Sequence, residues 1–385
     1  MKYIYLDYAA TTPADKRVIK AISPYFLKIF GNPSSYHEFG IEAKKILTDS
    51  RQKVSNFFNC TPEEIIFTSG GTESENLAVK GIGFSNKKNG KHVIISAVEH
   101  ASVDSSANFL EKQGFSITRI PVNRECHISV DSIESAIKDD TILVSVMYVN
   151  NEIGSIQPIQ EISEMLKRVN AERQKVGKHK ILFHVDGEAG SIYLDYDVTK
   201  LGVDSISVNG SKVYSIKGAS ALYVRKGVGV STQICGGGQE SLIRGGTENV
   251  PAIVALAEAL TIAKSERVKN TEKIIKIKNR LSESLKNIVG CRINTPVSSA
   301  PNILHVTFLN HQTTDLVKKL SEHGICVSSG SACASNKKEE KSRVLEAVGF
   351  NKDEMDMSIR FSLGKQNSAS DINRIIKTLN LVLVK

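Results

Sequence analysis

One stretch, from Ile181 to Arg225, constrains the fold of this chain more than any other. Its apolar runs and alternating patterns predict three strands, at residues 181–186, 203–208 and 221–224. A carboxylate, Asp186, stands at the end of the first strand, and a lone lysine, Lys212, follows the second. Because ligands of an α/β sheet bind where its strands end, these two side chains are candidates for one site.

An aspartate and a lysine in these places are the two groups that a pyridoxal 5'-phosphate (PLP) site requires. The lysine would form a Schiff base with the cofactor aldehyde, and the aspartate would pair with the pyridinium nitrogen and keep the ring an electron sink. The alternative is that Asp186 caps a helix and that Lys212 is solvated. This stretch alone leaves both interpretations open.

The rest of the chain repeats the alternation of strands with helices. Further strands are predicted at residues 64–68, 92–96, 116–120 and 141–147, and helices at 16–29, 41–58 and 163–176. This order predicts an α/β fold with a parallel sheet, in which ligands lie at the carboxyl ends of the strands. Glycine or polar residues follow the predicted strands at Gly71, Thr72, His100, Asn151, Asp186 and Lys212. Their shared placement favours the PLP site.

A glycine-rich turn, from Ser69 to Ser74, separates the strand at 64–68 from a helix predicted at Glu75 to Lys80. A strand, a glycine-rich turn and a helix start together form the layout that cradles phosphate, because free backbone N–H groups and the helix dipole face the anion. The alternative is a turn that carries Gly70 and Gly71 for its shape only.

The last third of the chain has the pattern of a smaller α+β domain. Helices are predicted at residues 251–264, 272–288, 314–323 and 371–381, and strands at 303–308 and 325–328. We place the large, cofactor-binding domain at residues 15–257. Residues 1–14 and 258–385 form the small domain, which carries a mobile loop at about residues 328–342.

Two residues of this small domain are candidates for chemistry. Cys333 lies among small, polar and charged residues, which predicts an exposed loop, and an exposed thiol near lysines is a possible nucleophile or an incidental thiol. Arg360 stands in a short apolar strand, where a buried guanidinium needs a partner. That partner is either a substrate carboxylate or a structural salt bridge.

Composition excludes several other classes of protein. The chain has 385 residues and a formal net charge of +9, and its widely scattered lysines favour a solvated surface over a nucleic-acid interface. No apolar run is long enough to span a bilayer, and the N-terminus lacks a signal-peptide pattern. The six cysteines lie far apart with no CxxC pair, so we expect no metal site, reduced thiols and a cytoplasmic location.

Several motifs, spread from Leu6 to Gly364, together resemble those of one family. They are residues 6–12 (LDYAATT), 31–35 (GNPSS), 68–74 (TSGGTES), 99–100 (EH), 149–154 (VNNEIG), 184–186 (HVD), 244–247 (RGGT), 328–333 (SSGSAC) and 360–364 (RFSLG). The chain resembles the cysteine desulfurases of the NifS/IscS type, which are fold-type I PLP enzymes. The resemblance implies a PLP-dependent transferase with a mainly parallel seven-stranded sheet in its large domain.

The resemblance also implies roles in cofactor binding. Lys212 would hold the cofactor and move protons, Asp186 would hold the pyridine nitrogen, and His100 would stack on the ring and act in acid–base steps. Asn151 would lie by the ring hydroxyl and the substrate. The phosphate would be held by Gly71, Thr72, Ser211 and, from the other subunit of a homodimer, Thr247, and Asn209 would be a further cofactor-binding residue.

For the substrate, the resemblance implies that Arg360 binds the carboxylate of L-cysteine. Cys333 would attack the substrate sulfur, retain it as a persulfide and release L-alanine. An acceptor protein would then take the sulfur for iron–sulfur cluster assembly, tRNA thiolation or DNA phosphorothioation. The alternatives are a selenocysteine lyase or other PLP enzyme of the same fold, and a weakly active paralogue that acts mainly as a partner protein.

Three residues depart from the family pattern, two just before the lysine and one just after the aspartate. Ser211 stands where the family usually has histidine, Asn209 where it has a small residue such as serine, and Ala189 where a glutamine bonds the ring hydroxyl. These departures suggest a specialised member that serves another acceptor than the usual iron–sulfur partner.

Overall fold

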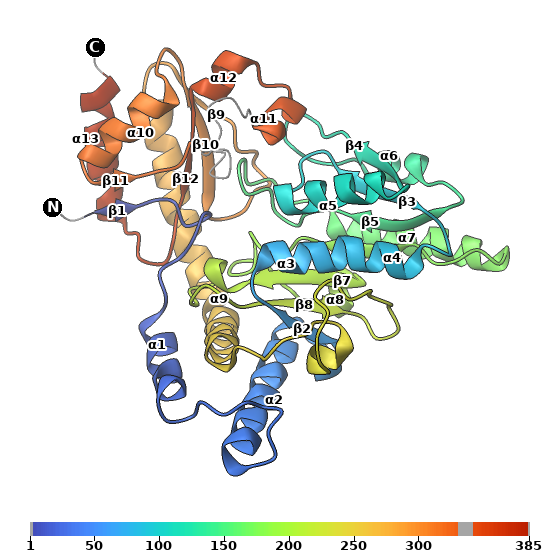
Figure 1. Cartoon of the computed structure of the whole chain (residues 1–385). Coiled ribbons are helices and arrows are strands. Elements are labelled where there is room, and N and C mark those ends of the chain that lie inside the picture. The colour runs from blue at the N-terminus through green and yellow to red at the C-terminus, as the bar shows by residue number, and fades with distance from the viewer. Residues whose placement is uncertain (1–2, 330–341, 384–385) are drawn as a thin grey trace.

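A seven-stranded sheet forms the centre of the molecule (Figure 1). The computed structural model describes residues 3–329 and 342–383. In spatial order the strands are β2 (Ile65–Thr68), β8 (Ser220–Val224), β7 (Ser205–Asn209), β6 (Leu182–Val185), β5 (Thr141–Ser145), β3 (His92–Ser96) and β4 (Ser116–Ile120). All neighbours pair in parallel except β8, which is antiparallel to both β2 and β7. The predicted α/β class with a mainly parallel sheet is confirmed.

Both faces of this sheet are covered, which explains why its strands are apolar on both sides. Successive residues of β3 alternate between two cores: Val93 and Ile95 pack with α5, whereas Ile94 packs in the main core with α2, α7 and α9. The helices around the sheet are α2 (Glu38–Phe58), α3 (Gly71–Asn76), α4 (Ile82–Asn86), α5 (Ala101–Lys112), α6 (Val130–Ala136), α7 (Ile159–Lys175), α8 (Val198–Leu201) and α9 (Val250–Lys286). Only the edge strand β4 is largely open to solvent.

A smaller part of the molecule joins the two ends of the chain. Its antiparallel sheet has the order β12 (Ser358–Ser362), β10 (Ile303–Phe308), β9 (Cys291–Ile293), and β1 (Ile4–Tyr5) pairs with β11 (Ile325–Cys326). Its helices are α10 (Thr313–Glu322), α11 (Arg343–Val348), α12 (Lys352–Asp356) and α13 (Ala369–Leu383). Both labelled ends of the chain lie beside this small sheet in Figure 1.

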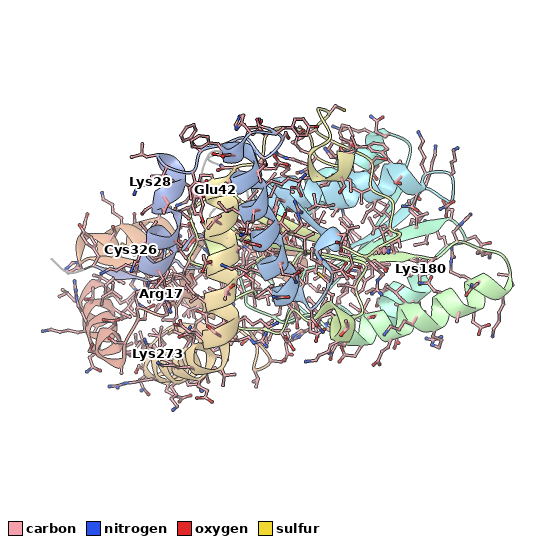
Figure 2. All side chains as sticks on the ribbon, turned by 90° about the horizontal axis from the view of Figure 1, so that it is seen from below. Arg17, Lys28, Glu42, Lys180, Lys273 and Cys326 are labelled. Carbon is pink, nitrogen blue, oxygen red and sulfur yellow. The ribbon has the colours of Figure 1, made fainter. Side chains whose placement is uncertain are left out.

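Helix α9 connects the large and small parts without a break. The predicted pair of helices at 251–264 and 272–288 is wrong, because α9 is a single helix of 37 residues. The polar residues between them contain neither glycine nor proline, so the helix continues with these residues on its exposed side. Figure 2 shows α9 beside α2, to which the Lys53–Glu258 ion pair ties it. The proposed domain division at 257/258 falls within α9 and stays a prediction.

Several helix boundaries also differ from the prediction, among them the start of α7, which lies at Ile159 and not at residue 163. Helix α1 (Lys16–Ile22) ends before Pro24 and gives way to a 3-10 turn, so the helix predicted to reach residue 29 is too long. Helix α3 begins at Gly71 rather than at Glu75, and a π-turn, Leu77–Gly81, joins it to α4.

Among the described residues, none of the helices combines the length and the apolar surface that a membrane span requires.

Candidate active site

A cavity of about 630 Å³ lies at the carboxyl ends of the parallel strands. Five of the residues predicted for the site line it, although they come from segments far apart in the sequence: His100, Asn151, Asp186, Lys212 and Arg360. The small and large parts of the molecule both contribute, since Arg360 belongs to β12 and Asp186 follows β6. The cavity therefore brings together a primary amine, a carboxylate, an imidazole and a guanidinium.

Lys212 ends a short 3-10 turn, Gly210–Lys212, that follows β7. Its ammonium nitrogen Nζ donates to the carbonyl oxygens of Ala9 and Ala10, each at 2.7 Å. These two residues also line the cavity. The N-terminal segment thus forms the wall against which the lysine amine is held.

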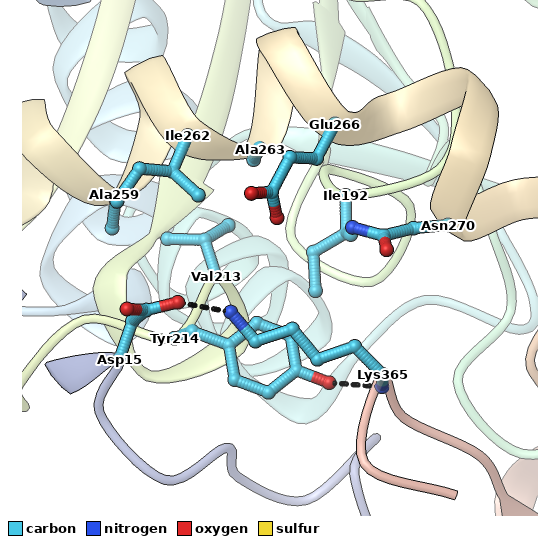
Figure 3. A pocket seen from close by; sticks show the side chains of 10 residues that line it. All are labelled: Asp15, Ile192, Val213, Tyr214, Ala259, Ile262, Ala263, Glu266, Asn270 and Lys365. Atoms are coloured by element: carbon cyan, nitrogen blue, oxygen red, sulfur yellow. Dashed lines mark hydrogen bonds and ion pairs between the residues drawn. The ribbon is translucent and has the colours of Figure 1, made fainter. Parts of the chain in front are cut away.

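The backbone around Lys212 is fixed by the same segment. Thr12 donates through its backbone N–H and its hydroxyl to the carbonyl of Ser211, at 2.8 and 3.0 Å, and its hydroxyl accepts the Tyr214 N–H at 2.8 Å. Figure 3 shows the other side of this loop, where the Tyr214 hydroxyl accepts the backbone N–H of Lys365 and the Lys365 ammonium pairs with Asp15. The pocket drawn there has a volume of about 10 Å³, which is about one water molecule and too small for a substrate.

Asp186 is buried directly after β6 and belongs to a dense group of acids. Oxygens of Glu75, Asp186 and Glu188 lie within 4.8 Å of one another. Burial, and then the charge of Asp186, raise the pKa values of Glu75 and Glu99 well above the ordinary range. Asp186 itself lines the cavity, where its carboxyl group can meet a cationic ring nitrogen.

His100 caps the N-terminus of α5 and lines the cavity at the same time. Its ring atom Nδ1 accepts the backbone N–H of Ser102 at 3.2 Å, so in the neutral ring Nε2 carries the proton. The imidazole therefore has a structural role as the cap of α5. It also fixes the orientation of the ring, as a stacking residue requires.

The two asparagines after β5 have different functions. Asn150 is buried, and its side-chain oxygen accepts the N–H groups of Glu152 and Ile153 at 3.0 and 2.9 Å, which holds the turn. Asn151 lines the cavity, and its backbone oxygen accepts a hydrogen bond from the Arg360 guanidinium at 2.8 Å. Only Asn151 is placed to meet a ligand.

Arg360 combines features of both roles considered for it. Its side chain is 1% exposed, and its Nη2 atom forms an ion pair with the Asp7 carboxylate at 2.8 Å. The structural salt bridge therefore exists. Arg360 nevertheless lines the cavity, so a substrate carboxylate can approach the same guanidinium.

The other predicted cofactor residues do not line the cavity. Gly71 begins α3, Asn209 is the last residue of β7, and Ser211 lies in the turn that follows. Thr72 and Thr247 are exposed. Sequence reasoning missed Glu188, which lines the cavity beside Gly71. Its position two residues after Asp186 was the only available signal.

Cys333 lies outside the described residues. The segments on either side of it are anchored at the cavity: the backbone N–H of Ser328 donates to Arg360 and its oxygen accepts from Arg360, at 3.2 and 2.9 Å. On the other side, the Ser342 hydroxyl donates to the buried Glu152 at 2.6 Å, and both residues line the cavity. The five cysteines at described positions are all free thiols.

The residues present fit a PLP group, because an amine (Lys212) and a buried carboxylate (Asp186) face one cavity of sufficient volume. Fold and site together thus define a PLP-dependent enzyme with a large parallel sheet.

The family model "Aminotransferase class-V" matches residues 4–375. The chain belongs to this family, whose members depend on PLP.

Relatives within the family are alike along their whole length. The "Cysteine desulfurase IscS" of Methanosarcina thermophila is 40% identical over 385 residues, which is 100% of this chain and 93% of the relative. A solved "NifS-like protein" is 33% identical with a TM-score of 0.91, over 99% of both chains. A structure described as "SspA in complex with cysteine" is 32% identical with a TM-score of 0.80, over 93% of this chain and 98% of its own.

Proposed function

We propose that this protein is a cysteine desulfurase that transfers the sulfur of L-cysteine to Cys333. The substrate C–S bond breaks and an S–S bond forms, so that L-cysteine and the Cys333 thiol give L-alanine and a Cys333 persulfide. The proton of the thiol passes to the alanine methyl group, which balances the reaction without an oxidant. The relatives named cysteine desulfurase support this assignment.

The observation that carries the proposal is the convergence of Lys212, Asp186 and Arg360 on one cavity. When bound, PLP supplies an electron sink for the substrate amino acid. Lys212 takes the proton from the substrate Cα, for which its amine has to be neutral. Asp186 holds the ring nitrogen, and Arg360 holds the substrate carboxylate.

The protein acts as a homodimer, and this part of the proposal rests on exposed residues. Thr247 does not line the cavity of its own chain and is exposed, as a residue that serves the partner's phosphate site would be. Large apolar side chains are also exposed between α1 and α2: Phe26, Leu27, Phe30 and Tyr36. Such a patch is typical of a protein–protein interface.

The Cys333 persulfide passes its sulfur to an acceptor protein. Iron–sulfur cluster assembly, tRNA thiolation and DNA phosphorothioation are the three candidate pathways. The departures at Ala189 and Ser211 favour an acceptor other than the usual iron–sulfur partner.

The test is to record the visible spectrum of the purified protein and the alanine that it forms from L-cysteine. We expect a cofactor band in the native protein that changes on addition of L-cysteine, with accumulation of alanine. Cys333→Ala should keep the band and lose alanine formation, and Lys212→Ala should lose both. If Cys333→Ala loses cysteine turnover but still releases alanine from selenocysteine, the protein is a selenocysteine lyase. A native protein without a band, even with added PLP, would leave only the role of a partner protein.

A further inference from the structure

The carboxyl group of Glu188 fills the space beside Gly71, where α3 begins. A Cβ atom on Gly71 would lie 1.5 Å from Glu188 Oε1 and 2.1 Å from its Cδ atom. The carboxyl can therefore lie here only because residue 71 has no side chain. Gly71 also begins a helical run that continues through the π-turn to Asn86, so the positive end of the helix dipole faces this carboxyl.

Two further residues predicted to bind the cofactor, Asn209 and Ser211, converge on the same group. The Asn209 side-chain nitrogen donates to Glu188 Oε2 at 3.1 Å. The oxygen of the same amide accepts the N–H and the hydroxyl of Ser211, each at 3.0 Å. Glu188 Oε1 is buried and has no hydrogen-bonding partner within the part of the chain that the structure describes. A buried polar atom without a partner marks a place where another group is expected.

An anion is costly at this place because of the charges around it. Oxygens of Asp186, which follows β6, and of Glu75 in α3 lie within 4.8 Å of a Glu188 oxygen. His100 from the start of α5 and Lys212 from the turn after β7 are the cationic or titratable groups that face it. Burial, and then the charge of Asp186, raise the pKa of Glu188 to about 7.

We propose that the Glu188 carboxyl competes with the phosphate group of PLP for the cradle formed by Gly71, Asn209 and Ser211, and thereby limits the affinity of the chain for its cofactor. This inference rests on the predicted placement of the phosphate. A phosphate dianion and a carboxylate repel each other at this distance. The phosphate enters when Glu188 is neutral or turns away, so PLP binding at alkaline pH takes up a proton or displaces the side chain.

The test is to titrate the full-length, cofactor-free protein with PLP and to follow binding by visible absorbance. The titration is done at about pH 8.5 and at about pH 6, one above and one below the pKa of about 7 of Glu188. Glu188→Gln removes the charge and keeps the shape. We expect it to bind PLP about tenfold more tightly than the native protein at the higher pH, which is the effect of one removed repulsion. The difference between the two proteins should nearly vanish at the lower pH, where native Glu188 is neutral. The comparison at each pH cancels the titration of PLP itself.

Two controls test whether the gain in PLP affinity depends on the phosphate group. Pyridoxal, which lacks the phosphate, should bind both proteins equally. Glu134→Gln removes a carboxyl of α6 that pairs with Arg168 and does not line the cavity, so it should leave the affinity for PLP nearly unchanged. If Glu188→Gln folds poorly, Glu188→Ala gives the same comparison, because it also removes the charge.

Three results would overturn the inference. The first is equal affinity of Glu188→Gln and the native protein for PLP at the higher pH. The second is an equal gain for pyridoxal, which would place the effect away from the phosphate. The third is the absence of PLP binding by both proteins, which would also contradict the cofactor placement; the first two leave that placement intact.

Discussion

The ion pair between Asp7 and Arg360 allows a quantitative test of what Arg360 does. Removal of one partner from a buried ion pair costs about 3–5 kcal/mol. Arg360 is 1% exposed, but the Asp7 side chain is 22% exposed, and asparagine keeps an acceptor oxygen. We therefore expect Asp7→Asn to lower the free energy of unfolding by about 2 kcal/mol. For 385 residues the entropy of unfolding is about 0.8 kcal/mol/K, so Tm should fall by about 2–3 °C.

The effect of the same pair on substrate binding has the opposite sign. In Asp7→Asn the charge of Arg360 is no longer neutralised by Asp7, so the KM for L-cysteine should fall. In Arg360→Gln the charge-assisted contact to the substrate carboxylate is lost, at about 3 kcal/mol, so the KM should rise about 100-fold. The assays are thermal unfolding and the rate of alanine formation over a range of L-cysteine concentrations.

Two further variants complete this test. Arg360→Lys keeps the charge without the bidentate fork and should lie between the native protein and Arg360→Gln in KM. Arg168→Gln breaks an ion pair to Glu134 in which both side chains are well exposed, and it should leave both Tm and KM nearly unchanged. If Arg360→Gln loses stability but keeps the native KM, Arg360 is a structural residue and the assignment to the substrate carboxylate is wrong.

Two other predictions concern stability. Thr12→Val removes the hydroxyl that bonds Ser211 and Tyr214 and leaves the buried Tyr214 N–H unpaired, so the free energy of unfolding should fall by about 1–3 kcal/mol. The control Thr11→Val loses only a 3.5 Å contact and should change stability less. Equal Tm values for the two variants would contradict this account of the lysine loop. Burial raises the pKa of Glu99 well above 4.5, so folding is favoured while this acid is protonated and loses stability as the pH rises above that value. Glu99→Gln should therefore raise Tm more at about pH 8.5 than at about pH 5.5, and a pH-independent difference would refute the assigned protonation.

Much of the site could be predicted because its residues follow strands. Periodicity located β3 at His92–Ser96 and the buried strand before Asp186 closely enough to place His100 and Asp186 at strand ends. In a parallel sheet those ends meet at one edge. The common location of five predicted residues in one cavity follows from this geometry.

The remaining features depend on contacts between distant segments. Glu188 and Gly71 lie 117 positions apart in the chain (188 minus 71), and no local pattern indicates that a carboxyl fills the space of a missing side chain. The start of α3 was misplaced for a related reason. The two glycines suggested a turn, but Gly71 is already helical, and its small size serves the contact to Glu188 rather than a turn.

The N-terminal segment shows how the two halves of the site are coupled. Asp7 holds the guanidinium at the expected substrate-carboxylate end, Ala9 and Ala10 hold the Lys212 amine, and Thr12 holds the backbone beside that amine. These contacts lie within six consecutive residues of the chain. β1 of the same segment pairs with β11 in the small part, while Thr12 bonds Ser211 beside β7 of the large sheet. The spacing between the Arg360 guanidinium and the Lys212 amine is therefore set by one short, continuous piece of backbone that is bonded to both parts of the molecule.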